Sequence, residues 1–310
     1  MKTQLINKVS FRDLFNYIFK AIFKTSKMYI FSIIMPTFAG VSLFLIKTKF
    51  GNVDYSERMG EVLTLFIVPF TFSLFTLSFI ISNFESSILL KQTKIFSISK
   101  WKIYLSILIC GVIVSLISFF TFIISLLIVE QFLIYKNTLH VFNNLSDLFM
   151  VDKTVGEGFL FFFSIVMSIN TYLFYMICLL LISYILCTLI KSQYVIQGIN
   201  TIIVITFLIL GDCALNGNYT VDTIINAAFN AAGYFFPIKA FQWLALSLLT
   251  NVTSYDYNIL QIIDNPKLEV PFTFFTNNSK IVLPVSFVMS SIWIVLFGVG
   301  ARFAYMRSIK

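Results

Sequence analysis

The chain has 310 residues, of which 58% are hydrophobic and only 12% are charged. Because a typical soluble domain carries about 25% charged residues, this composition excludes the soluble classes and predicts an integral membrane protein built as one membrane domain, 1–310. The net charge of +8 favours a nucleic-acid partner only if the positions of the cations are ignored. They cluster at the predicted cytoplasmic face, so no nucleic-acid partner is expected.

The first predicted element is an amphipathic helix over residues 10–24. Its apolar residues, among them Phe11, Phe15 and Phe19, recur with helical spacing, and Lys20 belongs to the opposite, basic face. An aromatic face beside a basic face is typical of a helix that lies in the bilayer surface and contacts membrane lipids. The alternative is the core helix of a soluble domain.

Six apolar segments have the length of roughly 20 residues that a membrane-spanning helix needs. They cover residues 28–46, 62–82, 103–129, 165–190, 194–210 and 281–306. An apolar lead-in from Phe159 precedes the fourth span, and we expect it to lie along the outer surface. No span carries Asp, Glu, Lys or Arg in its middle. That argues against a carrier coupled through an intramembrane carboxylate.

The second and third spans are joined by a short polar stretch, residues 84–102, which combines a single acid with several lysines and a Trp. A short amphipathic helix of this kind would rest at the headgroup level and be partly exposed to the cytosol. The alternative is an ordinary basic loop that only fixes orientation. The candidate residues of this stretch are Glu85, Lys91, Lys94, Ser97, Ser99, Lys100 and Trp101.

The pattern changes over residues 221–249, which are apolar but interrupted by polar residues. Pro237 divides this run into two pieces that are each too short to span, and Gly233 closes a small-residue surface suited to close helix packing. The sequence therefore predicts a re-entrant helical hairpin that enters and leaves by the same face. The alternative is one complete crossing.

Charge placement predicts the topology. With six spans and the hairpin outside, most cations, including the dense cluster in residues 84–102, fall on the cytoplasmic side, together with both termini. A complete crossing at 221–249 would move the carboxyl-terminal cations outside and weaken this bias. The coding bias toward Phe, Ile, Leu, Lys and Asn indicates a bacterial source, so the predicted location is the bacterial cell membrane.

The sequence offers little catalytic chemistry. It contains no G-x-x-x-x-G-K-[ST] phosphate-binding loop and no H-E-x-x-H motif, so the chain is not expected to be an enzyme. Four cysteines without C-x-x-C spacing and one histidine predict neither disulfides nor a metal site. Among the polar residues of the spans, Asn170 and Asn200 are candidates for a transport pathway. The alternative role is interhelical hydrogen bonding.

At this point the layout resembles the membrane subunits of type-2 ABC exporters. The likeness rests on an interfacial helix before the first span, a coupling helix between the second and third, and a re-entrant hairpin before the last. Its most specific part is Glu85 followed by a basic patch and Ser97-Ile98-Ser99-Lys100-Trp101, where many members carry Thr-Pro in place of Ser97-Ile98. Gly233-Tyr234-Phe235-Phe236-Pro237 is similar to the family's Asn-Pro turn, with Phe236 in place of Asn.

The resemblance implies a function. The chain would be the permease subunit of an exporter that moves an apolar or amphipathic substrate. A separate ABC ATPase would dock on the coupling helix and hold the ATP and magnesium, so this chain would need no cofactor. A second copy of the chain, or a sister permease, would complete the pore. The main alternative is a stand-alone secondary carrier or lipid scramblase without ATP coupling, and a further one is an assembly or immunity protein with no transport role.

Overall fold

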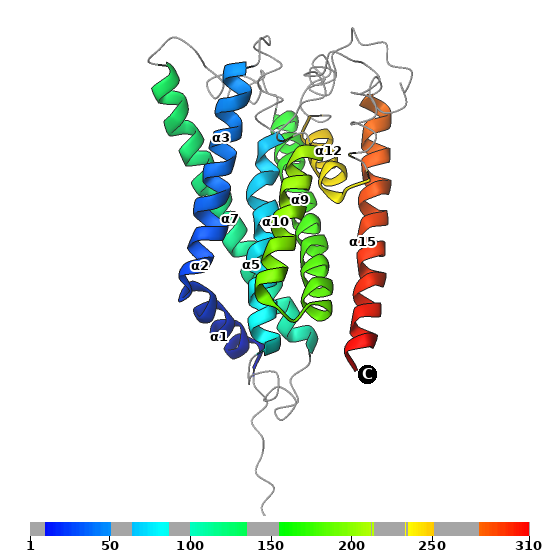
Figure 1. Ribbon diagram of the computed structural model, residues 1–310. Coiled ribbons are helices and arrows are strands. Elements are labelled where there is room, and N and C mark those ends of the chain that lie inside the picture. The colour runs from blue at the N-terminus through cyan, green and yellow to red at the C-terminus, as the bar shows by residue number, and fades with distance from the viewer. Residues whose placement is uncertain are drawn as a thin grey trace, which may run out of the picture.

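The computed structural model describes residues 10–50, 64–86, 100–134, 155–211, 213, 233, 235–250 and 279–309. Within that part of the chain every regular element is a helix. Six of these helices are long and apolar enough to cross a membrane. The prediction of an all-α polytopic membrane protein is therefore confirmed (Figure 1).

The helices form an up-and-down bundle in which successive crossings run in opposite directions (Figure 1). A short amphipathic helix lies at one end, which we call the α1 end, and a short helix inside the bundle marks the opposite end, the α12 end. In chain order the elements are α1 (Phe11–Phe23), α2 (Ser26–Tyr29), η1 (Ile30–Ile34), α3 (Met35–Phe50), η2 (Leu65–Ile67), α5 (Val68–Ser86), α7 (Lys100–Ile134), α9 (Val155–Leu189), α10 (Gln193–Leu210), α12 (Pro237–Thr250) and α15 (Ser279–Ile309).

Helix α5 is the centre of the bundle. It packs against α7, α9, α10 and the first crossing, which α2, η1 and α3 form together. Of the residues in its span 78% are buried, compared with 11% in the span of α15. Aromatic rings fill the space around it, and the Phe70 ring lies 5.0 Å from Tyr172 and 5.7 Å from Phe119. Because lipid is as apolar as these side chains, close van der Waals packing rather than exclusion of water holds such a core together.

Pro36 shapes the first crossing. Proline removes a backbone donor, and its ring clashes with the carbonyl group four residues earlier, which here belongs to Ser32. The chain accommodates this with a π-helical turn, Ile30–Ile34, directly before α3. The wider turn presents the buried Ser32 hydroxyl to Thr76 on α5, with which it forms a hydrogen bond.

The fourth crossing differs from expectation at its start. Helix α9 is continuous over 35 residues from Val155, so the prediction that the lead-in from Phe159 lies along the outer surface is wrong. Its only glycines, Gly156 and Gly158, lie in the first turn, and no proline interrupts it. At a rise of 1.5 Å per residue the helix is about 52 Å long, so it extends well beyond the roughly 30 Å hydrocarbon core.

Tyr175 offers a test of polar packing in this core. It is fully buried, and its hydroxyl lies 3.2 Å from Thr71 Oγ1, which also donates to the carbonyl oxygen of Ile67. Tyr175→Phe is therefore expected to lower the free energy of unfolding by about 0.5–1 kcal/mol, as for other interhelical hydrogen bonds in membranes. Thermal melting in detergent measures this. The matched change Tyr194→Phe, at an exposed tyrosine, should have no effect, and equal melting shifts would contradict the assignment.

Helix α12 does not cross the membrane. Its 14 residues span about 21 Å, less than the hydrocarbon thickness. It packs against α9, α10 and α15, and both the end of α10 and the start of α15 lie at the α12 end (Figure 1). The chain between these two helices thus leaves and returns at the same end, so the alternative of one complete crossing over 221–249 is wrong. The first half of the predicted hairpin, 221–232, lies outside the described residues.

Candidate functional site

The predicted coupling stretch begins and ends at the α1 end of the bundle. Helix α5 ends at Ser86 and α7 begins at Lys100, and both of these ends lie near α1 (Figure 1). Glu85 belongs to the last turn of α5, and Lys100 and Trp101 belong to the first turn of α7. The other candidates, Lys91, Lys94, Ser97 and Ser99, lie outside the described residues.

A second connection is tied to the same end. The turn between α9 and α10 exposes Lys191, and Gln193 Nε2 donates to Asn83 Oδ1 at 3.2 Å. This hydrogen bond joins the start of α10 to the last turns of α5.

Helix α1 uses its apolar face mainly to contact protein. Ser10 caps the helix by accepting a hydrogen bond from the Asp13 amide at 3.3 Å. One stripe of residues is buried, namely Leu14, Ile18 and Ile22, and α1 packs against α7. The sequence predicts one apolar face for this helix, and the pattern alone does not distinguish a contact with lipid from a contact with another helix.

The predicted aromatic residues of α1 flank this stripe. Phe11, Phe15 and Phe19 are half-buried, and the Phe19 ring lies 5.8 Å from Phe15 and 4.3 Å from Phe23. Lys20 is exposed on the opposite face. The aromatic row is therefore available to the bilayer, while α7 anchors the helix.

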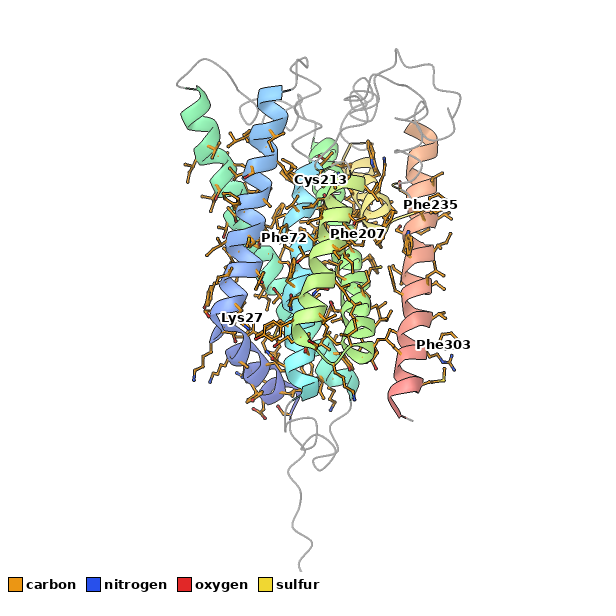
Figure 2. All side chains as sticks on the ribbon, viewed as in Figure 1. Lys27, Phe72, Phe207, Cys213, Phe235 and Phe303 are labelled. Atoms are coloured by element: carbon orange, nitrogen blue, oxygen red, sulfur yellow. The ribbon has the colours of Figure 1, made fainter. Side chains whose placement is uncertain are left out.

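A cluster of polar groups lies at the α12 end, where the first half of the chain meets the second. It consists of Thr64, Cys213 and Gln242 (Cys213 is labelled in Figure 2). Gln242 Nε2 donates to the carbonyl oxygen of Thr64 at 3.2 Å, and Cys213 Sγ lies 3.3 Å from that oxygen. The cluster links α12 and the end of α10 to the start of the second crossing.

The predicted hairpin residues Gly233 and Pro237 flank the turn that leads into α12. Pro237 is the first residue of the helix, where its missing donor costs nothing. The Phe236 amide donates to the carbonyl oxygen of Gly233 at 3.0 Å. Gly233 is buried, and a Cβ atom there would lie 2.6 Å from the carbonyl oxygen of Leu210 and 2.4 Å from Lys239 Cδ. Only glycine allows this close approach between the turn and the end of α10.

Two functional candidates were not selected from the sequence. Lys239 and Gln242 are 2% and 0% exposed within α12, although both are strongly polar. Their spacing of three residues places them on neighbouring positions of one helix face. Two strongly polar residues at this spacing inside an apolar run are the sequence pattern that could have identified them. Charged residues at membrane depth are costly and commonly mark functional sites.

The two asparagines proposed for a pathway have different environments. Asn170 is exposed on the surface of α9, so within the single chain it does not line the bundle interior. Asn200 on α10 is fully buried, and neither of its side-chain polar atoms has a hydrogen-bond partner among the described residues. An unsatisfied buried amide is expensive, which makes Asn200 the stronger candidate.

Asn200 shares its depth with two buried hydroxyl groups, those of Ser78 and Ser183, which also have no hydrogen-bond partner in the described residues. The hydrogen bond between Asn83 and Gln193 shows that these two residues lie at the same depth on α5 and α10. Ser78 on α5 and Asn200 on α10 each lie one to two helical turns further into the bundle. Ser183 lies one turn from Cys187, whose Sγ is 3.3 Å from the Ser78 carbonyl oxygen. We call these three residues the polar layer.

The described residues contain no group of three or more His, Cys, Asp or Glu side chains that could hold a metal ion. No protein-family model and no curated protein matches this chain. The fold itself defines the class, which is a multi-pass α-helical membrane protein with a transporter-like bundle of six spans.

Proposed function

We propose that this chain is the permease subunit of an ATP-driven exporter of the type-2 ABC class, located in a bacterial cell membrane. The observation that supports this most is the combination at the two ends of the bundle. An amphipathic helix packed on α7 accompanies the basic connection at the α1 end, and the half-helix α12 lies inside the opposite end (Figure 1).

The charge distribution supports a cytoplasmic α1 end. The cations at that end whose exposure the structure describes, Arg12, Lys20, Lys24, Lys27, Lys102, Lys191 and Arg302, are all exposed. Positive residues near the ends of spans favour the cytoplasmic side. The coupling stretch would then face the cytosol, where an ATPase subunit could dock.

The geometry suggests how work would enter the bundle. Helix α7 is continuous over 35 residues from Lys100, so it would act as a rigid lever of about 52 Å that starts at the docking surface. Because α1 packs against α7, the two would move together. ATP-driven closure of two ATPase subunits would shift two permease chains between two conformations. This requires that the closed ATPase pair binds one permease conformation more tightly than the other. ATP and magnesium would stay on the ATPase, and the permease would catalyse no reaction itself.

The polar layer and Lys239 are the candidates for the substrate pathway. In this conformation neither is accessible from outside the single chain, since Asn200 and Lys239 are almost fully buried. A two-state permease would expose one or both as it opens. Apolar walls with a few polar groups suit an apolar or amphipathic substrate.

The decisive test is affinity purification of the tagged chain in mild detergent, followed by mass spectrometry of the proteins that accompany it. We expect an ATPase with a phosphate-binding loop, and we expect it to be lost when Lys91, Lys94 and Lys100 are changed to Glu. Lys136 and Lys153 belong to the connection between the third and fourth predicted spans, which the predicted topology places outside. Their reversal to Glu is the matched control and should leave the ATPase bound. Glu85→Lys, and Ser99→Pro combined with Trp101→Ala, should uncouple ATP hydrolysis from transport at normal expression.

A chain that purifies without an ATPase in several detergents would contradict the proposal. Scrambling of labelled lipid by the pure chain in vesicles without ATP would then favour the stand-alone carrier or scramblase. Binding that survives charge reversal would place the docking surface elsewhere than residues 84–102.

A further inference from the structure

A cavity of about 250 Å³ lies at the α1 end, between α1, the start of the first crossing and α5. Its lining residues include Ile18 and Ile22 of α1, Met28 and Phe31 of the first crossing, and Phe75 and Phe79 of α5. It is open on one side, so it forms a groove, which we call the α1 groove. The groove belongs neither to the coupling stretch nor to the polar layer.

The inner walls of the α1 groove are suited to hydrocarbon. The Phe31 and Phe75 rings stack at 5.3 Å on one side. The one hydroxyl that lines the deeper part, that of Thr76, is already hydrogen-bonded to Ser32. A polar ligand would therefore find few groups to bind inside, whereas an alkyl chain would lose nothing by entering.

The mouth of the groove is cationic. Lys27 lines it, is exposed, and holds its ammonium group 5.3 Å from the centre of the Phe79 ring; Figure 2 labels it at the junction of α1 and the first crossing. Lys24, the C-cap of α1, is exposed three residues before Lys27. Within the described part of the chain, no carboxylate pairs with Lys27, and the acid of α1, Asp13, lies in its first turn. The field at the mouth therefore favours an anion.

The depth of the groove fits a lipid. Lys27 lies at the start of the first span, Ser26–Ile46, where headgroups are expected. The lining residues of α5 run from Asn83 to Phe75, about 12 Å further into the hydrocarbon region. The volume is below the roughly 300–1,000 Å³ of sites that enclose a whole small molecule, so the groove holds part of one chain rather than an entire ligand.

We propose that the α1 groove is a binding site for one anionic phospholipid. Its phosphate lies beside Lys27, and a segment of one acyl chain lies between Ile22 and Phe75. Such a lipid bridges α1 to α5. The proposal goes beyond the exporter function and does not depend on it, because it concerns the chain without an ATPase.

The test uses native mass spectrometry of the full chain released from nanodiscs that contain equal amounts of dioleoyl phosphatidylglycerol and dioleoyl phosphatidylcholine. We expect one phosphatidylglycerol to be retained per chain in preference to phosphatidylcholine. Lys27→Glu, which reverses the charge at the mouth, should lower this retained fraction roughly tenfold. Ala21→Phe, which fills the groove from the exposed side of α1 without changing a charge, should lower it similarly.

Three matched variants act as controls. Lys27→Arg keeps the charge, Ala21→Ser keeps the groove open, and Lys191→Glu reverses an exposed lysine at the same end but outside the groove. All three should retain the lipid as the unchanged chain does. Because Lys27 and Ala21 are exposed, the variants are expected to fold, and their melting temperatures in phosphatidylcholine alone verify this.

Equal retention in all variants would overturn the proposal, since the lipid would then lie elsewhere. Equal retention of the two lipids would also overturn it, because charge would play no part. Loss on Lys191→Glu as well would indicate a general surface effect. If an amino-terminal segment or a substrate tail fills the groove instead, Ala21→Phe would leave lipid retention unchanged. The readout does not involve ATP, so its failure is distinct from failure of the exporter proposal.

Discussion

Asn200→Leu is expected to raise the melting temperature of the purified chain. Both polar atoms of this fully buried amide have no hydrogen-bond partner among the described residues. Leucine has a similar size and removes the unsatisfied groups, so the free energy of unfolding should increase by about 1 kcal/mol. The matched change Asn170→Leu, at an exposed position, should leave the melting temperature unchanged. A lower melting temperature for Asn200→Leu would show that the amide is hydrogen-bonded in the folded chain.

We expect that the destabilising amide of Asn200 has a role in transport, because residues that lower stability are retained where function requires them. A cysteine at this position tests this directly, since the four native cysteines are all buried. In the resting chain, Asn200→Cys should resist a small charged thiol reagent. During ATP turnover with the proposed ATPase partner it should become labelled, whereas Asn170→Cys on the exposed surface of α9 should not. Protection of Asn200→Cys in both conditions would remove it from the pathway.

Gly233→Ala is expected to be strongly destabilising. The added Cβ would lie 2.6 Å from the backbone oxygen of Leu210 and 2.4 Å from Lys239 Cδ. The lysine side chain can shift, but the carbonyl oxygen at the end of α10 cannot do so without moving the helix. Overpacking of this kind costs about 1–3 kcal/mol, and thermal melting in detergent measures it.

Gly198→Ala is the matched control for this change. A Cβ there meets nothing within 4 Å, and alanine is the better helix former by roughly 1 kcal/mol. It should therefore leave the melting temperature unchanged or raise it. If Gly233→Ala melts like Gly198→Ala, the close contact between the hairpin turn and α10 is not part of the stable fold. A loss of transport larger than the loss of stability would indicate that α12 moves during function.

For helix α12 the local sequence pattern predicts the helix but not the environment of its polar residues. Its existence and approximate limits follow from Pro237 and from an apolar run too short to span. The burial of Lys239 and Gln242 does not follow, because their environment is supplied by elements far away in the chain. Gln242 reaches the carbonyl oxygen of Thr64, and α12 packs against α9 and α15.

The α1 groove shows a similar division. The amphipathic pattern of residues 10–24 predicts a helix with one apolar face, and that helix is present as Phe11–Phe23. The pattern does not predict that Ile18 and Ile22 line a cavity together with residues of α5 and the first crossing. Helix packing decides this, together with the turn that Pro36 imposes before α3.

By itself the sequence determined the membrane class, the six spans and the amino-terminal amphipathic helix, because each depends on the local length or period of apolar residues. Tertiary structure alone decided which residues face the interior. In a membrane helix nearly every face is apolar, and lipid resembles the protein core, so hydrophobic period no longer reports the buried side. The rotation of α9 and α10 against α5 therefore separates the buried Asn200 from the exposed Asn170, although the two look equivalent along the chain.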